Sequence, residues 1–246
     1  MTRRLLRLIL VAALFVVPVS AFAQTGTVID WGPDSHAWES GYNSTTYLTS
    51  TGSVLEMVGI VNGFAGPLSI YNPARGGGAE YTFYIKGFRA TGPTTVTSGL
   101  TLSVYTTNYA GGTIEIHKDT TPDAAFGTSP PNGTVPSTFI DGPLFLSGSM
   151  PTLTVTVTRM KSNGSYVNGR YDTNDPPNGV WTGGSAIAQV SGSSSPCPFR
   201  MSGGWDMRPA DVLVGYVSHP DGHIDLNCPT SASPSTWGKI KSQYRD

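Results

Sequence analysis

The chain has 246 residues, and its composition is that of a folded, turn-rich protein. Its 30 glycines and 19 prolines form about a fifth of the sequence, more than ordinary domains carry and less than disordered Gly/Pro-rich chains. Charged residues make up only 13%, which excludes a coiled coil and a charge-rich disordered chain. No run of Lys or Arg follows Arg7, so no nucleic-acid partner is expected.

The first 23 residues have the three parts of a secretory signal peptide in the expected order. Three arginines near the start precede the apolar stretch Leu8–Val17, and the small-residue pattern Ala21–Ala23 follows. The apolar stretch is shorter than the roughly 20 residues that span a membrane. No second apolar span follows, so we expect no membrane span after cleavage and a secreted, periplasmic or cell-surface location. Cleavage removes three arginines and leaves a net charge of about −4.

Alternation of apolar and polar residues predicts β-strands along the rest of the chain. From Thr152 to Thr158, Leu153, Val155 and Val157 share one face and threonines occupy the other. The same alternation predicts strands at Glu80–Lys86, Leu100–Tyr105, Thr113–His117, Asp211–Val217 and His223–Asn227. Turn residues that separate such runs stand at Asn108–Gly112, Asn163–Gly164, Asn168–Gly169 and Pro220–Gly222. The pattern predicts an all-β fold, an antiparallel β-sandwich or jelly-roll-like arrangement with long loops.

The spacing of these elements predicts one domain that spans residues 24–228. Two long loops interrupt it, Lys118–Ser137 and Ser191–Pro209, and neither has the charge-rich composition of an inter-domain linker. Residues 229–246 form a Ser/Pro-rich C-terminal tail.

Cysteine usage predicts one disulfide bond. Cys197 and Cys228 are the two cysteines of the chain, and in an oxidising compartment two such residues pair. The bond would fasten the loop around Cys197 to the end of the last predicted strand. Its expected role is structural.

Two groups of polar residues have a composition that suits metal ions. His219, Asp221, His223 and Asp225 flank a Pro-Asp-Gly turn, and zinc accepts imidazole and carboxylate ligands. The alternative is an ordinary turn with exposed histidines. Oxygen ligands for calcium are offered by Asp172, Asn174 and Asp175, although the EF-hand pattern is broken by two prolines. The alternative is an ordinary turn, since Asp/Asn-rich turns are common without a metal, and we expect no bound cofactor.

Four tryptophans lie in predicted loops or at strand ends, where binding residues are often displayed. The candidates for stacking on the apolar faces of sugar rings are Trp31, Trp38, Trp181 and Trp205. The alternative is that these side chains fill the edges of the core.

Catalytic motifs are missing from the sequence. It has no G-x-S-x-G, H-E-x-x-H, S-x-x-K or Walker A pattern. Glycoside hydrolysis needs only two carboxylates at a suitable distance, and with 16 acidic residues the sequence does not test this. A non-enzymatic role is therefore favoured.

Three stretches in the middle of the chain resemble bacterial exported surface proteins of the PEP-CTERM type: Gly99–Tyr105, Gly112–Asp119 and Phe139–Gly148. The similarity is a strand, a short strand that ends in Asp, and a Phe-x-Asp-Gly turn before another strand. The resemblance implies a surface or extracellular-matrix setting and no catalytic residues. The Pro-Glu-Pro motif and the hydrophobic anchor of that family are absent from the end of the chain, so it implies release or non-covalent retention.

These observations predict an exported, non-enzymatic β protein of the cell envelope or extracellular matrix with a structural or adhesive role. The alternatives are a glycan-binding module and a secreted polysaccharide-active hydrolase. Expected partners are polysaccharides or other surface proteins.

Overall fold

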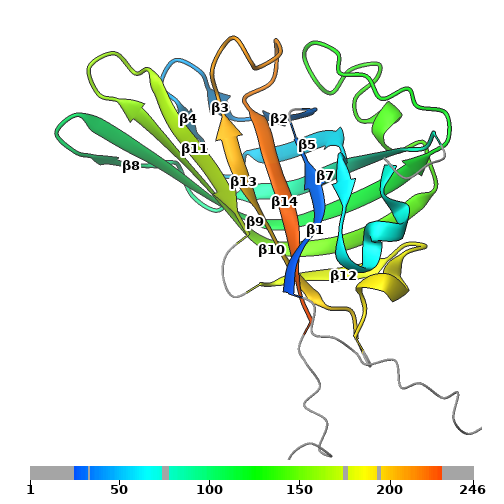
Figure 1. Ribbon diagram of the computed structural model, residues 1–246. Coiled ribbons are helices and arrows are strands. Elements are labelled where there is room, and N and C mark those ends of the chain that lie inside the picture. The colour runs from blue at the N-terminus through cyan, green and yellow to red at the C-terminus, as the bar shows by residue number, and fades with distance from the viewer. Residues whose placement is uncertain (1–24, 33, 74–77, 174–176, 193–194, 229–246) are drawn as a thin grey trace, which may run out of the picture. The chain divides into compact units, whose positions relative to one another are not determined.

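The protein is a predominantly antiparallel β structure, seen in a computed structural model (Figure 1). The structure describes residues 25–32, 34–73, 78–173, 177–192 and 195–228. The predicted signal peptide 1–23 and the predicted tail 229–246 lie outside these residues. The described strands belong to one compact unit, Gln24–Pro229. No helix among the described residues is long and apolar enough to cross a membrane.

Fourteen strands and three short 3-10 helices make up the described part of the unit. The strands are β1 Thr25–Trp31, β2 Ser35–Glu39, β3 Tyr42–Asn43, β4 Leu48–Thr49, β5 Val54–Ile60, β6 Gly63–Phe64, β7 Glu80–Ala90, β8 Thr95–Ser98, β9 Leu102–Asp119, β10 Leu144–Met160, β11 Tyr166–Asp172, β12 Gly179–Gly183, β13 Pro198–Asp206 and β14 His219–Asn227. The helices are η2 Gly66–Tyr71, η4 Ser137–Phe139 and η5 Ile187–Val190.

Strand order follows the chain for most of the sheet. The neighbours run β2-β5-β7-β9-β10-β11-β13-β14-β1-β6, and β12 and β8 pair beside this path. The sheet bends so that β11, β13, β14 and β1 form one layer over β5, β7, β9 and β10 (Figure 1). Where the layers meet, Ala37 of β2 exchanges backbone hydrogen bonds with the segment before β14. The predicted antiparallel, sandwich-like all-β fold is confirmed.

The core lies between the two layers and is built by the predicted alternation. Leu153, Val155 and Val157 of β10 are buried, and the threonines between them face away from the core. Tyr81 and Phe83 of β7 enter the same cluster as Trp31, Trp181 and Phe199 from other strands. Burial of these large apolar side chains provides most of the driving force for folding.

A second, smaller core covers the opposite face of β2, β5 and β7. Val58 and Tyr84 point to this face, and Val135 and Phe139 from the predicted loop Lys118–Ser137 and its continuation pack on them. Backbone and side chains fasten this segment to β7, where the Thr82 hydroxyl donates to the carbonyl of Phe139 at 2.9 Å. The long loop is therefore a packed cover, and β5 and β7 are buried on both faces.

Several predicted turns lie inside strands. Asn108–Gly112 is part of β9, which pairs with β7 and β10 on either side, and its Gly111 has a φ of 74°. Asn168–Gly169 is likewise part of β11. Pro220–Gly222 belongs to β14, and Pro220 sits near its start, where a strand tolerates proline. The predicted turn at Asn163–Gly164 is confirmed between β10 and β11.

Two further predictions near the end of the unit are wrong. Asp211–Val217 is not a strand: the Asp211 N–H closes a turn onto the Arg208 carbonyl at 2.9 Å, and a second turn contains Gly215 with a φ of 92°. The predicted loop Ser191–Pro209 contains β13, where Phe199 and Met201 are fully buried. Those two residues alternate with polar neighbours, so the period-two signal for this strand was present in the sequence.

Candidate functional site

The predicted disulfide is present and joins Cys197 to Cys228. Cys197 is buried just before β13, and its backbone N–H donates to the Val190 carbonyl at 2.8 Å. The bond links this turn to the residue that directly follows β14. Such a bond fits an oxidising compartment, extracellular or periplasmic.

A cleft of about 680 Å³ lies where three segments meet at one end of the sandwich. The segments are the β3–β4 turn, the β10–β11 turn and the stretch 207–217 that leads toward β14. Four tyrosines and two arginines stand in its wall together with small polar and apolar residues: Tyr42, Ser44, Tyr47, Arg159, Asn163, Gly164, Ser165, Tyr166, Met207, Arg208, Pro209, Val212, Leu213, Val214, Gly215, Tyr216 and Val217.

The β3–β4 turn places Tyr47 in this wall. The Asn43 carboxamide oxygen accepts hydrogen bonds from the backbone N–H groups of Thr45 and Thr46, each at 2.9 Å. This side chain fixes the tight turn, and Tyr47 closes it with a φ of 63°. A tyrosine rarely adopts the left-handed region, so contacts with the surrounding residues must hold the backbone of Tyr47 in this conformation.

Arg159, at the end of β10, forms the floor of the cleft and is 6% exposed. Its Nη1 donates to the Gly164 carbonyl at 3.0 Å, and its Nη2 lies 3.7 Å from the Met207 sulfur. The guanidinium lies 3.6 Å from the centre of the Tyr47 ring, a cation–π contact. Its Nε is buried and has no hydrogen-bond partner. The described residues thus hold this cation in place without a carboxylate partner.

A smaller cavity of about 30 Å³ lies deeper, behind Tyr42 and Arg159. Glu39 lines it, and its two carboxylate oxygens accept hydrogen bonds from the Tyr109 hydroxyl and the Thr49 hydroxyl, each at 3.0 Å. Burial raises the pKa of Glu39, and these two hydrogen bonds oppose the rise. The cavity has room for one or two water molecules, but not for a sugar.

Among the described residues that line the cleft and the cavity, Glu39 is the single carboxylate. Glycoside hydrolysis by the usual mechanisms uses a pair of carboxyl groups on either side of the scissile bond. The wall of the cleft offers aromatic faces, hydrogen-bond donors and a cation.

The four predicted metal ligands on β14 occupy alternating positions, so they share the outer face of the strand in a row. His223 Nε2 lies 3.4 Å from Asp225 Oδ2, whereas the ring of His219 lies 5.0 Å from that of His36. His219, Asp221, His223 and Asp225 do not converge on a point. Among the described residues, the three acids whose ligand atoms do lie close together are Asp119, Asp123 and Asp141, which are not on β14.

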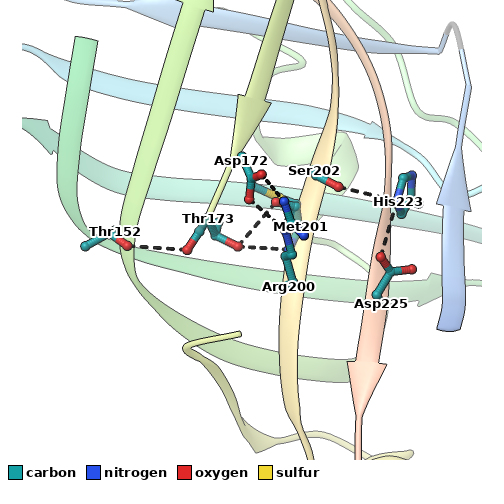
Figure 2. A network of polar contacts seen from close by, with 8 residues as sticks. All are labelled: Thr152, Asp172, Thr173, Arg200, Met201, Ser202, His223 and Asp225. Atoms are coloured by element: carbon teal, nitrogen blue, oxygen red, sulfur yellow. Dashed lines mark hydrogen bonds and ion pairs between the residues drawn. The ribbon is translucent and has the colours of Figure 1, made fainter. Parts of the chain in front are cut away.

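Ser202, His223 and Asp225 lie side by side on this face, but they do not form a catalytic triad (Figure 2). Ser202 Oγ is 3.3 Å from His223 Nε2, and Asp225 contacts the same nitrogen. A triad needs the acid on one ring nitrogen and the nucleophile on the other, so that the imidazole relays a proton. The Asp225 carboxylate also accepts a hydrogen bond from Thr27 at 2.8 Å.

Asp172, one of the three predicted calcium ligands, is an ion-pair partner. Both of its carboxylate oxygens face the Arg200 guanidinium across β11 and β13 (Figure 2). Asn174 and Asp175, the other two, lie outside the described residues.

The four tryptophans considered for sugar stacking are all in the interior. Trp31, Trp181 and Trp205 are at most 3% exposed, and Trp38 is 6% exposed in the smaller core. They fill the core, as the alternative interpretation held, and Trp205 also forms part of the wall of the small cavity. Large aromatic rings gain most by leaving water, and their position in the sequence did not reveal this.

One group of acids is not apparent from the sequence. Ligand atoms of Asp119, Asp123 and Asp141 lie within 4.8 Å of one another where the long cover segment begins and ends. Loss of hydration beside the other acids, together with the carboxylates of Asp141 and Asp119, raises the pKa of the exposed Asp123. An all-oxygen set suits calcium chemistry, but exposed acids gather in this way without a metal as well.

Comparison of the chain with protein-family models, curated proteins and solved structures finds no match. The assignment of a function therefore rests on the geometry of the end cleft.

Proposed function

We propose that this protein is an exported, non-enzymatic β protein of the cell envelope or extracellular matrix that binds a glycan in its end cleft. The observation that carries the proposal is the cleft itself. It is large enough for a mono- or disaccharide, and four tyrosines stand in its wall.

The wall has the groups that sugar recognition uses. Tyr47 and Tyr166 are partly exposed, so their rings offer apolar faces for the C–H groups of a sugar. Ser44, Asn163 and Ser165 stand at the two turns and provide hydrogen-bonding groups for hydroxyls. The few polar groups around an aromatic wall are typical of small-molecule sites.

A binding role agrees with the chemistry that this region lacks. A hydrolase of the paired-acid type would need a second carboxylate beside Glu39, and none lines the described wall. The Ser202–His223–Asp225 row has the wrong connectivity for acyl transfer.

Export is supported by the pattern of residues 1–23 and by the disulfide. The PEP-CTERM-type resemblance adds support for a surface or matrix setting. Fractionation of cells that produce the full chain tests this part of the proposal: the mature protein is expected outside the cytoplasm and to begin at residue 24.

The cleft is tested by a glycan array that contains neutral and acidic saccharides, followed by titration of the best ligands. Tyr47→Ala is expected to weaken binding about tenfold or more, because stacking on an aromatic ring contributes a few kcal/mol. Tyr71→Ala is the control, since Tyr71 is another partly buried tyrosine that packs on the core outside the cleft. An array without any bound saccharide, or equal losses in both variants, would overturn the proposal.

A further inference from the structure

Arg159 is a buried cation for which the described protein provides no anion. It is only 6% exposed, yet its guanidinium takes part in no ion pair among residues that the structure describes. The nearest acid in the site, Glu39, has both oxygens engaged by hydroxyl donors. A buried charge without a counter-ion is costly, and proteins generally pair it.

The second arginine of the cleft differs in this respect. Arg208 contacts Asp206 with two nitrogens and Asp211 at 3.0 Å, so its charge is matched by its own neighbours. No carboxylate stands among the described residues that line the outer cleft. Arg159 is therefore the arginine of this cleft that has no ion-pair partner among the described residues.

The hydrogen-bonding groups of Arg159 show where an anion could bind. Nη1 donates to the Gly164 carbonyl and Nη2 is directed to the Met207 sulfur, whereas Nε has no partner. The Tyr42 side chain also interacts with this guanidinium. A single cation without a counter-ion matches the single charge of a carboxylate, whose two oxygens can accept from two guanidinium nitrogens.

We propose that the ligand of the end cleft is an acidic saccharide, a uronic-acid unit whose carboxylate pairs with Arg159. This inference rests on the proposed glycan-binding function. The sugar ring would lie against the tyrosines, and the carboxylate would supply the counter-ion that the protein lacks. Tyr47 covers one face of the guanidinium from an exposed turn, so its ring would have to shift for the anion to reach Arg159.

The test compares galacturonate or its oligomers with the matching galactose compounds by calorimetric titration. The wild-type protein is expected to bind the acidic sugar about tenfold more tightly, which is the worth of one charged hydrogen bond. Raising the salt concentration is expected to reduce this preference only partly, because a buried pair is screened less than an exposed one.

Arg159→Gln is expected to abolish the preference, and Arg159→Lys to keep part of it. Arg89→Gln, which neutralises an exposed arginine on β7 outside the cleft, is the matched control. Circular dichroism and thermal melting establish that each variant is folded. If Arg159→Gln does not fold, the comparison of acidic and neutral sugars on the wild-type protein decides alone.

The possible results separate the two proposals. Loss of the acid preference in Arg159→Gln but not in Arg89→Gln supports the pairing of a uronic acid with Arg159. Equal binding of the acidic and neutral sugars by the wild-type protein overturns that pairing and leaves the glycan-binding function standing. Absence of binding by every saccharide overturns both.

Discussion

We expect His36 to make the fold sensitive to mild acid. It lies on β2 in the smaller core, 6% exposed, with its ring 4.8 Å from that of Phe126 and 4.9 Å from that of Tyr216. Neither ring nitrogen has a hydrogen-bond partner. Burial, followed by the nearby His219, lowers the pKa of His36 from 6.5 to about 4, although the Ser35 backbone and then Asp34 act in the opposite direction.

The sign of the effect follows from proton linkage. Between pH 6.5 and pH 4 the unfolded chain carries a proton on His36 and the folded protein does not. Stability is therefore fully present above pH 6.5 and declines as the pH falls toward 4. The decline between pH 7 and pH 4.5 amounts to about 2 kcal/mol for this one group.

His36→Phe removes the titration and retains an aromatic ring in the same contacts. Urea unfolding of the wild type and the variant at pH 7 and pH 4.5 measures the effect. The difference in unfolding free energy between the two proteins is expected to change by about 2 kcal/mol in favour of the variant at the lower pH. Phe126→Leu, which loosens the same cluster but keeps the imidazole, is expected to retain the wild-type pH slope. Parallel slopes for the wild type and His36→Phe would refute the reasoning.

Two further predictions concern the disulfide and the β10–β11 turn. Replacing Cys197 and Cys228 by Ser is expected to lower the unfolding free energy by about 3–4 kcal/mol, since the bond closes a sequence separation of 31 residues; a loss below about 1 kcal/mol in urea unfolding would contradict this. Gly164→Ala is expected to lower stability by about 1 kcal/mol and to weaken glycan binding, because φ is 72° and the new Cβ would lie 3.2 Å from the Tyr47 ring. Gly52 has a φ of 82° and open space around it, so Gly52→Ala is expected to lower stability without weakening glycan binding.

The strands could be predicted from the sequence where burial alternates residue by residue. Leu153, Val155 and Val157 show this, because each inward side chain faces the core directly from a regular strand. Turn residues were less informative. Asn108–Gly112 has the composition of a hairpin turn, yet partners on both sides keep it extended, and such partners are not visible in the local sequence.

The end cleft could not be predicted, because its wall is assembled from distant segments. Tyr47, Arg159 and Met207 come together only when β10 and the stretch after β13 meet the β3–β4 turn. The local sequence around each of these residues gives no sign of a binding site. The disulfide was predictable for the opposite reason, since two cysteines allow a single intramolecular pairing.

The pairing of the first strand with the last has a consequence for the order of folding. Thr25 of β1 lies opposite Asn227 of β14, about 200 residues further along the chain. During synthesis or vectorial transport from the N-terminus, β1 lacks this partner until nearly the whole unit has emerged. Closure of so long a loop is entropically costly and slow, so β1 pairs with β14 only late in folding. If the chain is exported as proposed, this delay keeps it unfolded while it passes through a narrow pore.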